Sequence, residues 1–156
     1  MRMRAWVLGT CGAVMVAAGM AGPAGAATEP EADLSFHGSA VMNGDRVEVR
    51  VSPHNDGPSA VSGASVQLRW SVPLAERQLL PDGCARTDAR TVVCDTGELA
   101  EGETGEQLRV AVQLAGAPSE FTLEVDTAWN GGAVDRDRSN DQLKVLVLDT
   151  GDAYAF

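Results

Sequence analysis

Two cysteines offer the most specific chemistry in this sequence. Cys84 and Cys94 lie ten positions apart, at the two ends of the stretch Cys-Ala-Arg-Thr-Asp-Ala-Arg-Thr-Val-Val-Cys. A closed zinc site needs further cysteine or histidine ligands, and a thiol-disulfide redox motif needs a spacing of two residues between its cysteines. This pair meets neither condition. We therefore predict a structural disulfide that closes a short loop.

A second candidate is the run Asp135-Arg-Asp-Arg-Ser-Asn-Asp141. Its oxygen-bearing side chains, Asp135, Asp137, Asn140 and Asp141, resemble the ligands of a calcium loop. The run departs from the EF-hand pattern, because Asn140 replaces the turn glycine and Leu146 stands where the bidentate glutamate belongs. Its two arginines would also neutralise part of the charge. Asn and Asp in loops often bond to their own backbone, so calcium binding and ordinary loop structure are the two interpretations.

Catalytic residues do not form a recognisable set. The two histidines, His37 and His54, have no Gly-x-Ser-x-Gly motif or similar nucleophile signal beside them. We expect His54 to be solvated in a loop and His37 to face water from a strand. Pairs of carboxylates for glycoside hydrolysis depend on their separation in space, which the sequence does not give. The protein is therefore predicted not to be an enzyme, and an extracellular hydrolase is the third-ranked alternative.

The first 26 residues have the pattern of a secretory signal peptide. A start of Met-Arg-Met-Arg leads into a weakly apolar run and then to Ala24-Gly-Ala26 before Thr28. The alternative is a retained membrane anchor, but glycines and a proline interrupt the apolar run, which is too short for a spanning helix. We expect cleavage after residue 26 or 27, and a protein that is secreted, extracellular or loosely associated with the cell surface.

Cleavage would leave a strongly acidic chain of 130 residues, the size of one domain. It removes Arg2 and Arg4 from the 12 basic residues and none of the 22 acidic residues, so the net charge becomes −12. That charge repels phosphate backbones and anionic lipid headgroups. It argues against nucleic-acid binding, and we expect no membrane insertion after cleavage.

Five segments alternate apolar and polar residues with a period of two, and residues 33–42 and 91–94 complete the count as a first strand and a short central one. In residues 46–52, for example, Val47, Val49 and Val51 alternate with polar neighbours, which predicts a strand with one buried face. Seven such strands, without a segment of helical period longer than a turn or two, predict an all-β fold, a β-sandwich. The predicted strands are residues 33–42, 46–52, 65–72, 91–94, 106–114, 120–126 and 142–147.

The segments between and beyond these strands have the residues of turns and chain ends. Asn43-Gly44 predicts a tight hairpin turn in which both residues take positive φ. Residues 97–103 are predicted to be a polar turn before the fifth strand. Residues 27–32 are predicted to be a short linker, and residues 149–156 an acidic, disordered tail.

Five motifs follow one another in a fixed order. They are Val-Arg-Val-Ser-Pro-His-Asn-Asp-Gly-Pro-Ser-Ala at residues 49–60, Val-x-Leu at 66–68, Leu-Pro-Asp-Gly-Cys at 80–84, Val-Val-Cys-Asp-Thr-Gly-Glu-Leu-Ala-Glu-Gly-Glu at 92–103 and Asp-x-Asp-x-x-Asn-Asp at 135–141. Their order resembles the immunoglobulin-like DUF11 domain of bacterial secreted and cell-surface proteins, which is related to the CARDB modules. The resemblance covers residues 33–148. It implies a seven-stranded immunoglobulin-like β-sandwich and a non-catalytic role.

The function that these observations predict is extracellular binding, adhesion or cell-surface structure, with an extracellular protein or a cell-wall component as the partner. The alternative is a calcium-dependent or carbohydrate-binding surface protein that uses the loops at residues 54–56 and 130–141. In an immunoglobulin-like sandwich these loops would lie at one end. Trp129, at the mouth of the second loop, is either an exposed platform for a ligand or a core residue. No cofactor is expected other than calcium in that alternative.

Overall fold

The structure of the protein is a computed structural model, which describes residues 28–156. The predicted signal peptide, residues 1–26, lies outside the described residues. The described part of the chain contains nine strands and no helix, and so no helix that could span a membrane. The strands are β1 (Leu34–Asn43), β2 (Arg46–Asn55), β3 (Val61–Trp70), β4 (Cys84–Arg86), β5 (Thr91–Leu99), β6 (Leu108–Gln113), β7 (Glu120–Trp129), β8 (Leu143–Leu148) and β9 (Ala153–Ala155).

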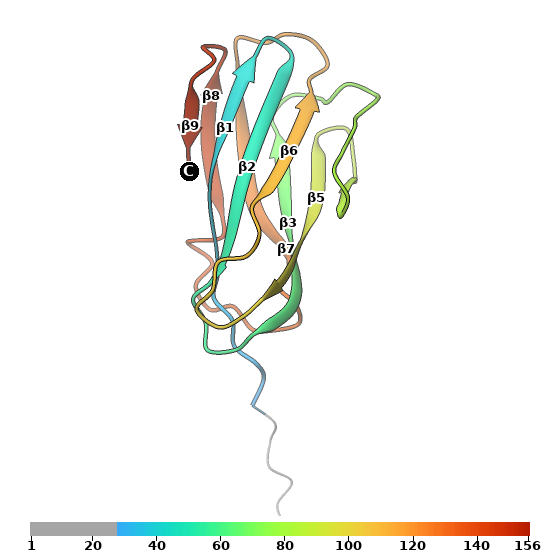
Figure 1. The fold of residues 1–156 in the computed structure, drawn as a ribbon. Coiled ribbons are helices and arrows are strands. Elements are labelled where there is room, and N and C mark those ends of the chain that lie inside the picture. The colour runs from blue at the N-terminus through green and yellow to red at the C-terminus, as the bar shows by residue number, and fades with distance from the viewer. Residues whose placement is uncertain (1–27) are drawn as a thin grey trace, which may run out of the picture.

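These strands form two antiparallel sheets, which confirms the all-β, sandwich-like fold (Figure 1). A four-stranded sheet has the order β6-β2-β1-β9, and a five-stranded sheet has the order β4-β5-β3-β7-β8. The prediction of seven strands missed the two shortest, β4 and β9. Each has only three residues, which is too few to show an alternating pattern.

The core lies between the two sheets. Alternate residues of each long strand point inward, as the period of two predicted: Val47, Val49 and Val51 of β2 are all buried, with exposed neighbours. Trp70 at the end of β3 is completely buried. One hydrophobic cluster combines residues of both sheets, so each sheet buries its apolar face against the other.

The first hairpin forms where it was predicted, but its turn lies one residue further on. Asn43 still pairs with Arg46, so Gly44 and Asp45 are the two turn residues. Gly44 has a φ of 63°, and no residue other than glycine has a positive φ among the described residues. A two-residue turn with glycine at its first central position is type II′, which needs positive φ at that position only. The prediction of positive φ at Asn43 was therefore wrong.

The fifth strand runs through the segment predicted as a turn. Strand β5 continues to Leu99, which is buried, although the polar turn was expected to begin at residue 97. A register shift in the pairing of β3 with β5 lies at this point, between the pairs Ala64–Gly97 and Ser65–Asp95. Gly97, with a φ of 72°, permits the bulge there. Strand β5 thus continues beyond Gly97, although the sequence at this glycine favoured a turn.

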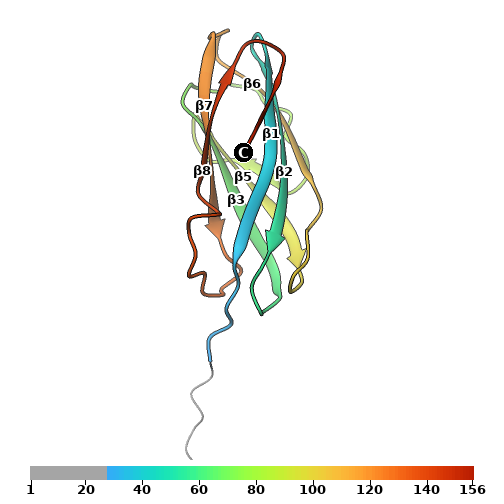
Figure 2. The same ribbon diagram turned by 90° about the vertical axis from the view of Figure 1, so that its left-hand side faces the viewer.

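The acidic tail is not disordered. Ala153–Ala155 form β9, which pairs with the upper half of β1 and closes that edge of the four-stranded sheet (Figure 2). Phe156 exchanges two backbone hydrogen bonds with Gly38, at 3.0 and 3.1 Å. A Cβ atom at position 38 would lie 2.7 Å from the Phe156 ring and 2.0 Å from the carbonyl oxygen of Arg50. The ring therefore lies over a glycine that has no room for a side chain, and the sequence showed no sign of this contact.

This contact predicts that Phe156 contributes to stability. We expect Phe156→Ala to lower the free energy of unfolding by about 1–2 kcal/mol, because the ring is half-buried against the core. Leu79→Ala is the control, since Leu79 is 96% exposed and its loss should change the value by less than about 0.5 kcal/mol. Urea unfolding of both variants measures the difference, and an unchanged value for Phe156→Ala would mean a disordered tail.

Candidate functional site

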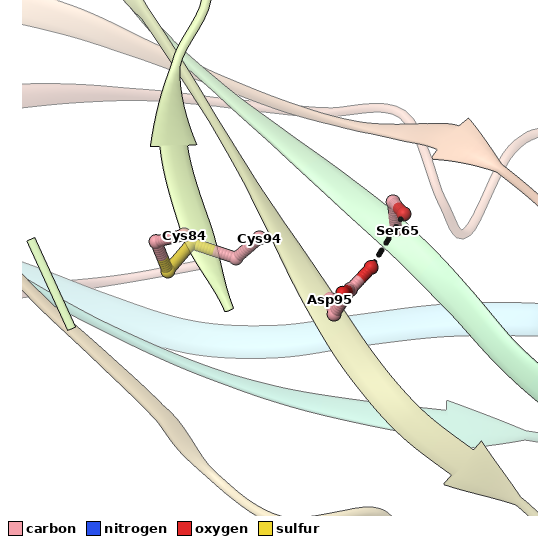
Figure 3. The surroundings of a disulfide bond; sticks show 4 residues. All are labelled: Ser65, Cys84, Cys94 and Asp95. Atoms are coloured by element: carbon pink, nitrogen blue, oxygen red, sulfur yellow. Dashed lines mark hydrogen bonds between the residues drawn. A yellow bond between two sulfur atoms is a disulfide. The ribbon is translucent and has the colours of Figure 1, made fainter. Parts of the chain in front are cut away.

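The predicted disulfide is present and joins neighbouring strands of one sheet. Cys84 of β4 lies directly opposite Cys94 of β5, and their sulfur atoms are bonded (Figure 3). Cys94 is completely buried and belongs to the same hydrophobic cluster as Trp70. The bond holds the short strand β4, and with it the long connection after β3, against the rest of the sheet.

Next to the disulfide, the outer face of the five-stranded sheet carries a polar pair. The hydroxyl group of Ser65 on β3 donates a hydrogen bond to Asp95 on β5, at 3.2 Å (Figure 3). The backbone N–H of Asp95 donates to the carbonyl oxygen of Gly83 at 2.9 Å. Asp95 therefore ties together three segments, β3, β5 and the chain that enters β4.

The loops at residues 54–56 and 130–141 lie at the same end of the molecule. That end is organised around Asn55, whose side chain is completely buried at the end of β2. Its Oδ1 accepts hydrogen bonds from the N–H groups of Asp33 and Gly57, and its Nδ2 donates to the carbonyl oxygens of Ser59 and Leu99. One amide group thus fixes the chain before β1, the β2–β3 loop and the end of β5.

The chain that enters β1 lies between the two predicted loops and joins them. Asp33 accepts a hydrogen bond from the Nδ2 of Asn140 at 2.8 Å, and its carbonyl oxygen accepts one from the N–H of Asp56 at 2.7 Å. The predicted linker is part of this arrangement, since Ala32 is buried and its N–H donates to the carbonyl oxygen of Val134. The two loops approach each other through this segment.

His54 is not solvated in a loop, because β2 extends to Asn55. Its Nδ1 lies 2.9 Å from the hydroxyl oxygen of Thr104, and its Nε2 lies 3.0 Å from a carboxylate oxygen of Asp56. The side chain is 25% exposed. The ring therefore connects the end of β2 with the β5–β6 loop, while His37 faces solvent from β1 as predicted.

Two of the four candidate calcium ligands bond to nearby backbone. The carboxylate of Asp135 accepts hydrogen bonds from the N–H groups of Leu34, at 3.0 Å, and Asp137, at 3.0 Å. Asp137 accepts bonds from the N–H and hydroxyl groups of Ser139, which lower the pKa of its carboxyl group. These two carboxylates hold the loop in shape, which is the ordinary role of Asp in loops.

Asp141, the fourth candidate, is a buried carboxylate paired with an arginine. Arg138 places one guanidinium nitrogen 3.3 Å from Asp141 and another 2.7 Å from Asp126 on β7. Burial raises the pKa of the Asp141 carboxyl group, and the side chain of Thr127 and the charge of Arg138 oppose that shift in part. The charges of Asp135 and Asp126 raise the pKa further.

The guanidinium group of Arg138 therefore already lies between two carboxylates, that of Asp141 in the loop and that of Asp126 on β7. Residues 28–156 bring no three His, Cys, Asp or Glu side chains close enough together to hold a metal ion. The structure does place Asp135 and Asp141 near each other, but it directs Asp137 and Asn140 to other partners. Calcium binding by this loop stays a prediction.

Trp129 is exposed, with 54% of its surface accessible. It lies at the end of β7, where a register shift separates the pair Ser65–Trp129 from the pair Val66–Thr127. The bulge changes the alternation of side chains, so that Trp129 lies opposite Ser65 on the outer face of the five-stranded sheet. The sequence placed this residue at the mouth of the loop but left its exposure open, because a bulge cannot be read from alternation alone.

Two polar side chains in the β3–β5 region were missed. Arg86 of β4 donates hydrogen bonds to the backbone carbonyl oxygens of Leu74, Ala75, Glu76, Asp88 and Ala89. Gln78 bonds to the backbone of Gln113 with both atoms of its amide group. No local pattern marks either residue, since most of their partners are backbone groups ten or more residues away in the sequence.

Comparison of the sequence with protein-family models gives no match, and comparison with curated proteins gives no significant match. The resemblance to the DUF11 domain thus rests on its ordered motifs alone.

The disulfide predicts a measurable contribution to stability. Replacement of Cys84 and Cys94 together by alanine should lower the free energy of unfolding by about 3 kcal/mol, because the unfolded chain regains the freedom of the closed loop. The same loss should follow reduction of the wild-type protein with dithiothreitol, which controls for the packing of the new methyl groups. Denaturant curves that coincide with and without the bond would contradict a structural role.

Asp141 and Asp137 predict opposite dependences of stability on pH. A carboxyl group whose pKa is raised on folding binds its proton more tightly in the native state, so its ionisation destabilises the fold as the pH rises above 3.8. Asp141→Asn should therefore gain stability relative to wild type as the pH rises from 3.8 through the raised pKa. Asp137 has a lowered pKa, so its stabilising effect is present above pH 3.8 and is lost as the pH falls through the lowered value.

Unfolding free energies of wild type, Asp141→Asn and Asp137→Asn, measured from acid to neutral pH, test these signs. Asp137→Asn is the matched control, because it removes a carboxylate from the same loop. At neutral pH it should be less stable than wild type, and that difference should vanish in acid. A difference between Asp141→Asn and wild type that is independent of pH would show that Asp141 titrates normally.

Proposed function

We propose that this protein is a secreted, non-catalytic, immunoglobulin-like module that acts outside the cell by binding, adhesion or structural support at the cell surface. The observation that carries the proposal is the Cys84–Cys94 disulfide within a two-sheet β fold. Disulfides persist in oxidising compartments and are rare in the reducing cytoplasm, where thiols are kept reduced. The predicted signal peptide before the described residues agrees with export.

The strand order supports the immunoglobulin-like part of the proposal. Apart from β4 and β9, seven strands remain, in the orders β6-β2-β1 and β5-β3-β7-β8. The first, second and fifth of these seven thus form one sheet, and the third, sixth and seventh lie together in the other, as in immunoglobulin domains. The fourth, β5, joins the third strand rather than the fifth, which departs from the constant-type domain. A buried tryptophan on the third strand, Trp70, also agrees with this class.

A second candidate function is saccharide binding on the outer face of the five-stranded sheet. The exposure of Trp129 favours it, because an exposed indole ring is a flat apolar platform with a polar edge. The Ser65–Asp95 pair lies in the same row of the sheet and offers hydrogen-bonding groups beside that platform. Trp129→Ala should abolish any saccharide binding without a change in melting temperature.

Export and surface binding test the main proposal. The full chain, expressed with its own residues 1–27, should appear outside the cytoplasm with a shortened N-terminus and without free thiols. The purified, oxidised protein should then bind to cell-envelope fractions or to an extracellular protein, and should show no turnover on a panel of hydrolase substrates. Retention of the intact, reduced chain in the cytoplasm would contradict the proposal.

A further inference from the structure

The two edges of the four-stranded sheet differ in how far their backbone groups are paired. At the β1 edge, β9 and Phe156 pair with the upper half of the strand, and the carbonyl oxygen of Asn140 accepts a hydrogen bond from the N–H of Phe36 further down. The opposite edge is β6, which pairs with β2 only. An edge without a partner strand presents a row of free N–H and C=O groups, to which another chain can pair.

The hydrogen bonds of Gln113, the last residue of β6, show which way the backbone groups of this strand point. The backbone N–H and C=O groups of Gln113 point away from β2. The N–H donates to the side-chain oxygen of Gln78, and the C=O accepts from the side-chain nitrogen of Gln78 and from the backbone N–H of Ala75. Backbone groups in an antiparallel strand alternate between its two sides. The N–H and C=O groups of Arg109 and Ala111 therefore also point away from β2, and neither residue has a backbone partner on that side among residues 28–156.

Gln78 makes the bonds that an added strand would make. Its Nε2 donates to the carbonyl oxygen of Gln113 at 2.8 Å, and its Oε1 accepts from the N–H of Gln113 at 2.9 Å. The side-chain amide thus replaces one residue of a neighbouring strand at the upper end of β6. The part of the edge around Arg109 and Ala111 has no such cover.

Open space lies near both ends of this uncovered part of the edge. A cleft of about 580 Å³, lined by Asp82, Asp95, Glu106 and Arg109 among others, lies beside the lower half of β6. A larger hollow of about 870 Å³ lies over the same sheet, from β1 to the upper half of β6, and both Ala111 and the almost fully exposed Leu79 line it. The lower space is acidic, with three carboxylates against one guanidinium, whereas the charged side chains that line the upper space are Arg46, Arg77 and Glu48.

We propose that the open edge of β6 accepts an extended, basic segment of a partner protein as an added antiparallel strand. Main-chain hydrogen bonds from Arg109 and Ala111 hold the segment, as in other cases of β-strand addition. Because the added strand runs opposite to β6, its first residues lie at the upper end of β6, towards Leu79, and its last residues lie in the acidic cleft. Basic residues at its C-terminal end match Asp82 and Glu106 in charge. This inference rests on the proposed role in extracellular binding.

The charge of the molecule favours a partner over a second copy. Two copies that paired along β6 would bring two acidic clefts together in a protein with an excess of ten negative charges over the whole chain. Like charges across an interface oppose association, whereas a basic segment is attracted over several ångströms. The occupant that fits this edge is therefore cationic and extended.

A synthetic probe peptide tests the inference. It is acetylated and amidated, alternates valine with threonine, and carries lysine at its last two polar positions. The oxidised protein should bind it, and amide hydrogen exchange should slow at Arg109 and Ala111 in particular. The same peptide with glutamate in place of lysine should bind about tenfold more weakly or worse at low salt. Failure of the lysine peptide to bind, or protection at a different edge, would overturn the inference.

Ala111→Pro separates the edge from the fold. Proline has no N–H group, but the N–H of Ala111 is not used in pairing with β2, and proline is tolerated on edge strands. The variant should bind the lysine peptide about tenfold more weakly, since main-chain bonds to the added strand are lost. Ala111→Thr keeps the N–H group and is the matched control, with binding near that of wild type. Equal binding by both variants would contradict strand addition.

A charge variant keeps the test valid if Ala111→Pro does not fold. Glu106→Gln combined with Asp82→Asn, both at exposed positions, should weaken binding of the lysine peptide several-fold and reduce its dependence on salt. Protection of the Arg109 and Ala111 amides that appears without peptide, and grows with protein concentration, would identify a second copy as the occupant and overturn the basic partner.

The proposed function and the proposed strand addition to β6 can be contradicted separately. If the exported protein binds cell-envelope material and Ala111→Pro binds it equally well, the edge inference falls and the proposed function stands. If the wild-type chain is neither exported nor bound outside the cell, the proposed function falls, whatever the peptide does in solution.

Discussion

The backbone groups at the edges of its two sheets constrain this protein more than any other feature. A chain made only of strands leaves N–H and C=O groups unpaired wherever a sheet ends, and those groups must be covered, solvated or used. Here the covering is done by elements that look unimportant in the sequence. A three-residue strand and the half-buried Phe156 close the β1 edge, and the side chain of Gln78 covers one residue of β6. The part of β6 around Arg109 and Ala111 has no such cover.

The loop end of the molecule is held by buried polar groups rather than by apolar packing. Asn55 satisfies four backbone groups from three segments, and Asp33 and Asp135 connect those segments to the 130–141 loop. The acidic residues that suggested a cation site are thus largely occupied with the chain itself. The motif at residues 135–141 therefore resembles a set of calcium ligands in the sequence, but in the fold most of its side chains bond to the protein itself.

The sequence predicted well whatever depends on alternation or on a pair of residues. The seven long strands, the buried face of β2 and the disulfide all follow from local patterns. The sequence-based predictions failed where backbone groups far away in the sequence determine the local structure. The bulge at Gly97, the strand at 153–155 and the bonds of Arg86 to residues 74–76 depend on partners ten or more residues away. Likewise, Trp129 was placed correctly beside its loop, but its exposure depends on a bulge.

The pairing of β9 with β1 also sets how the described chain would respond to mechanical tension. Because the two strands are antiparallel, β9 runs back along β1, so that Phe156 lies beside the middle of β1 while residue 28 precedes the start of that strand (Figure 2). A force that pulled these two points apart would load the hydrogen bonds between β9 and β1 one after another, like a zipper, rather than all together in shear. The small C-terminal strand would therefore peel away first, and the larger sandwich would remain intact behind it.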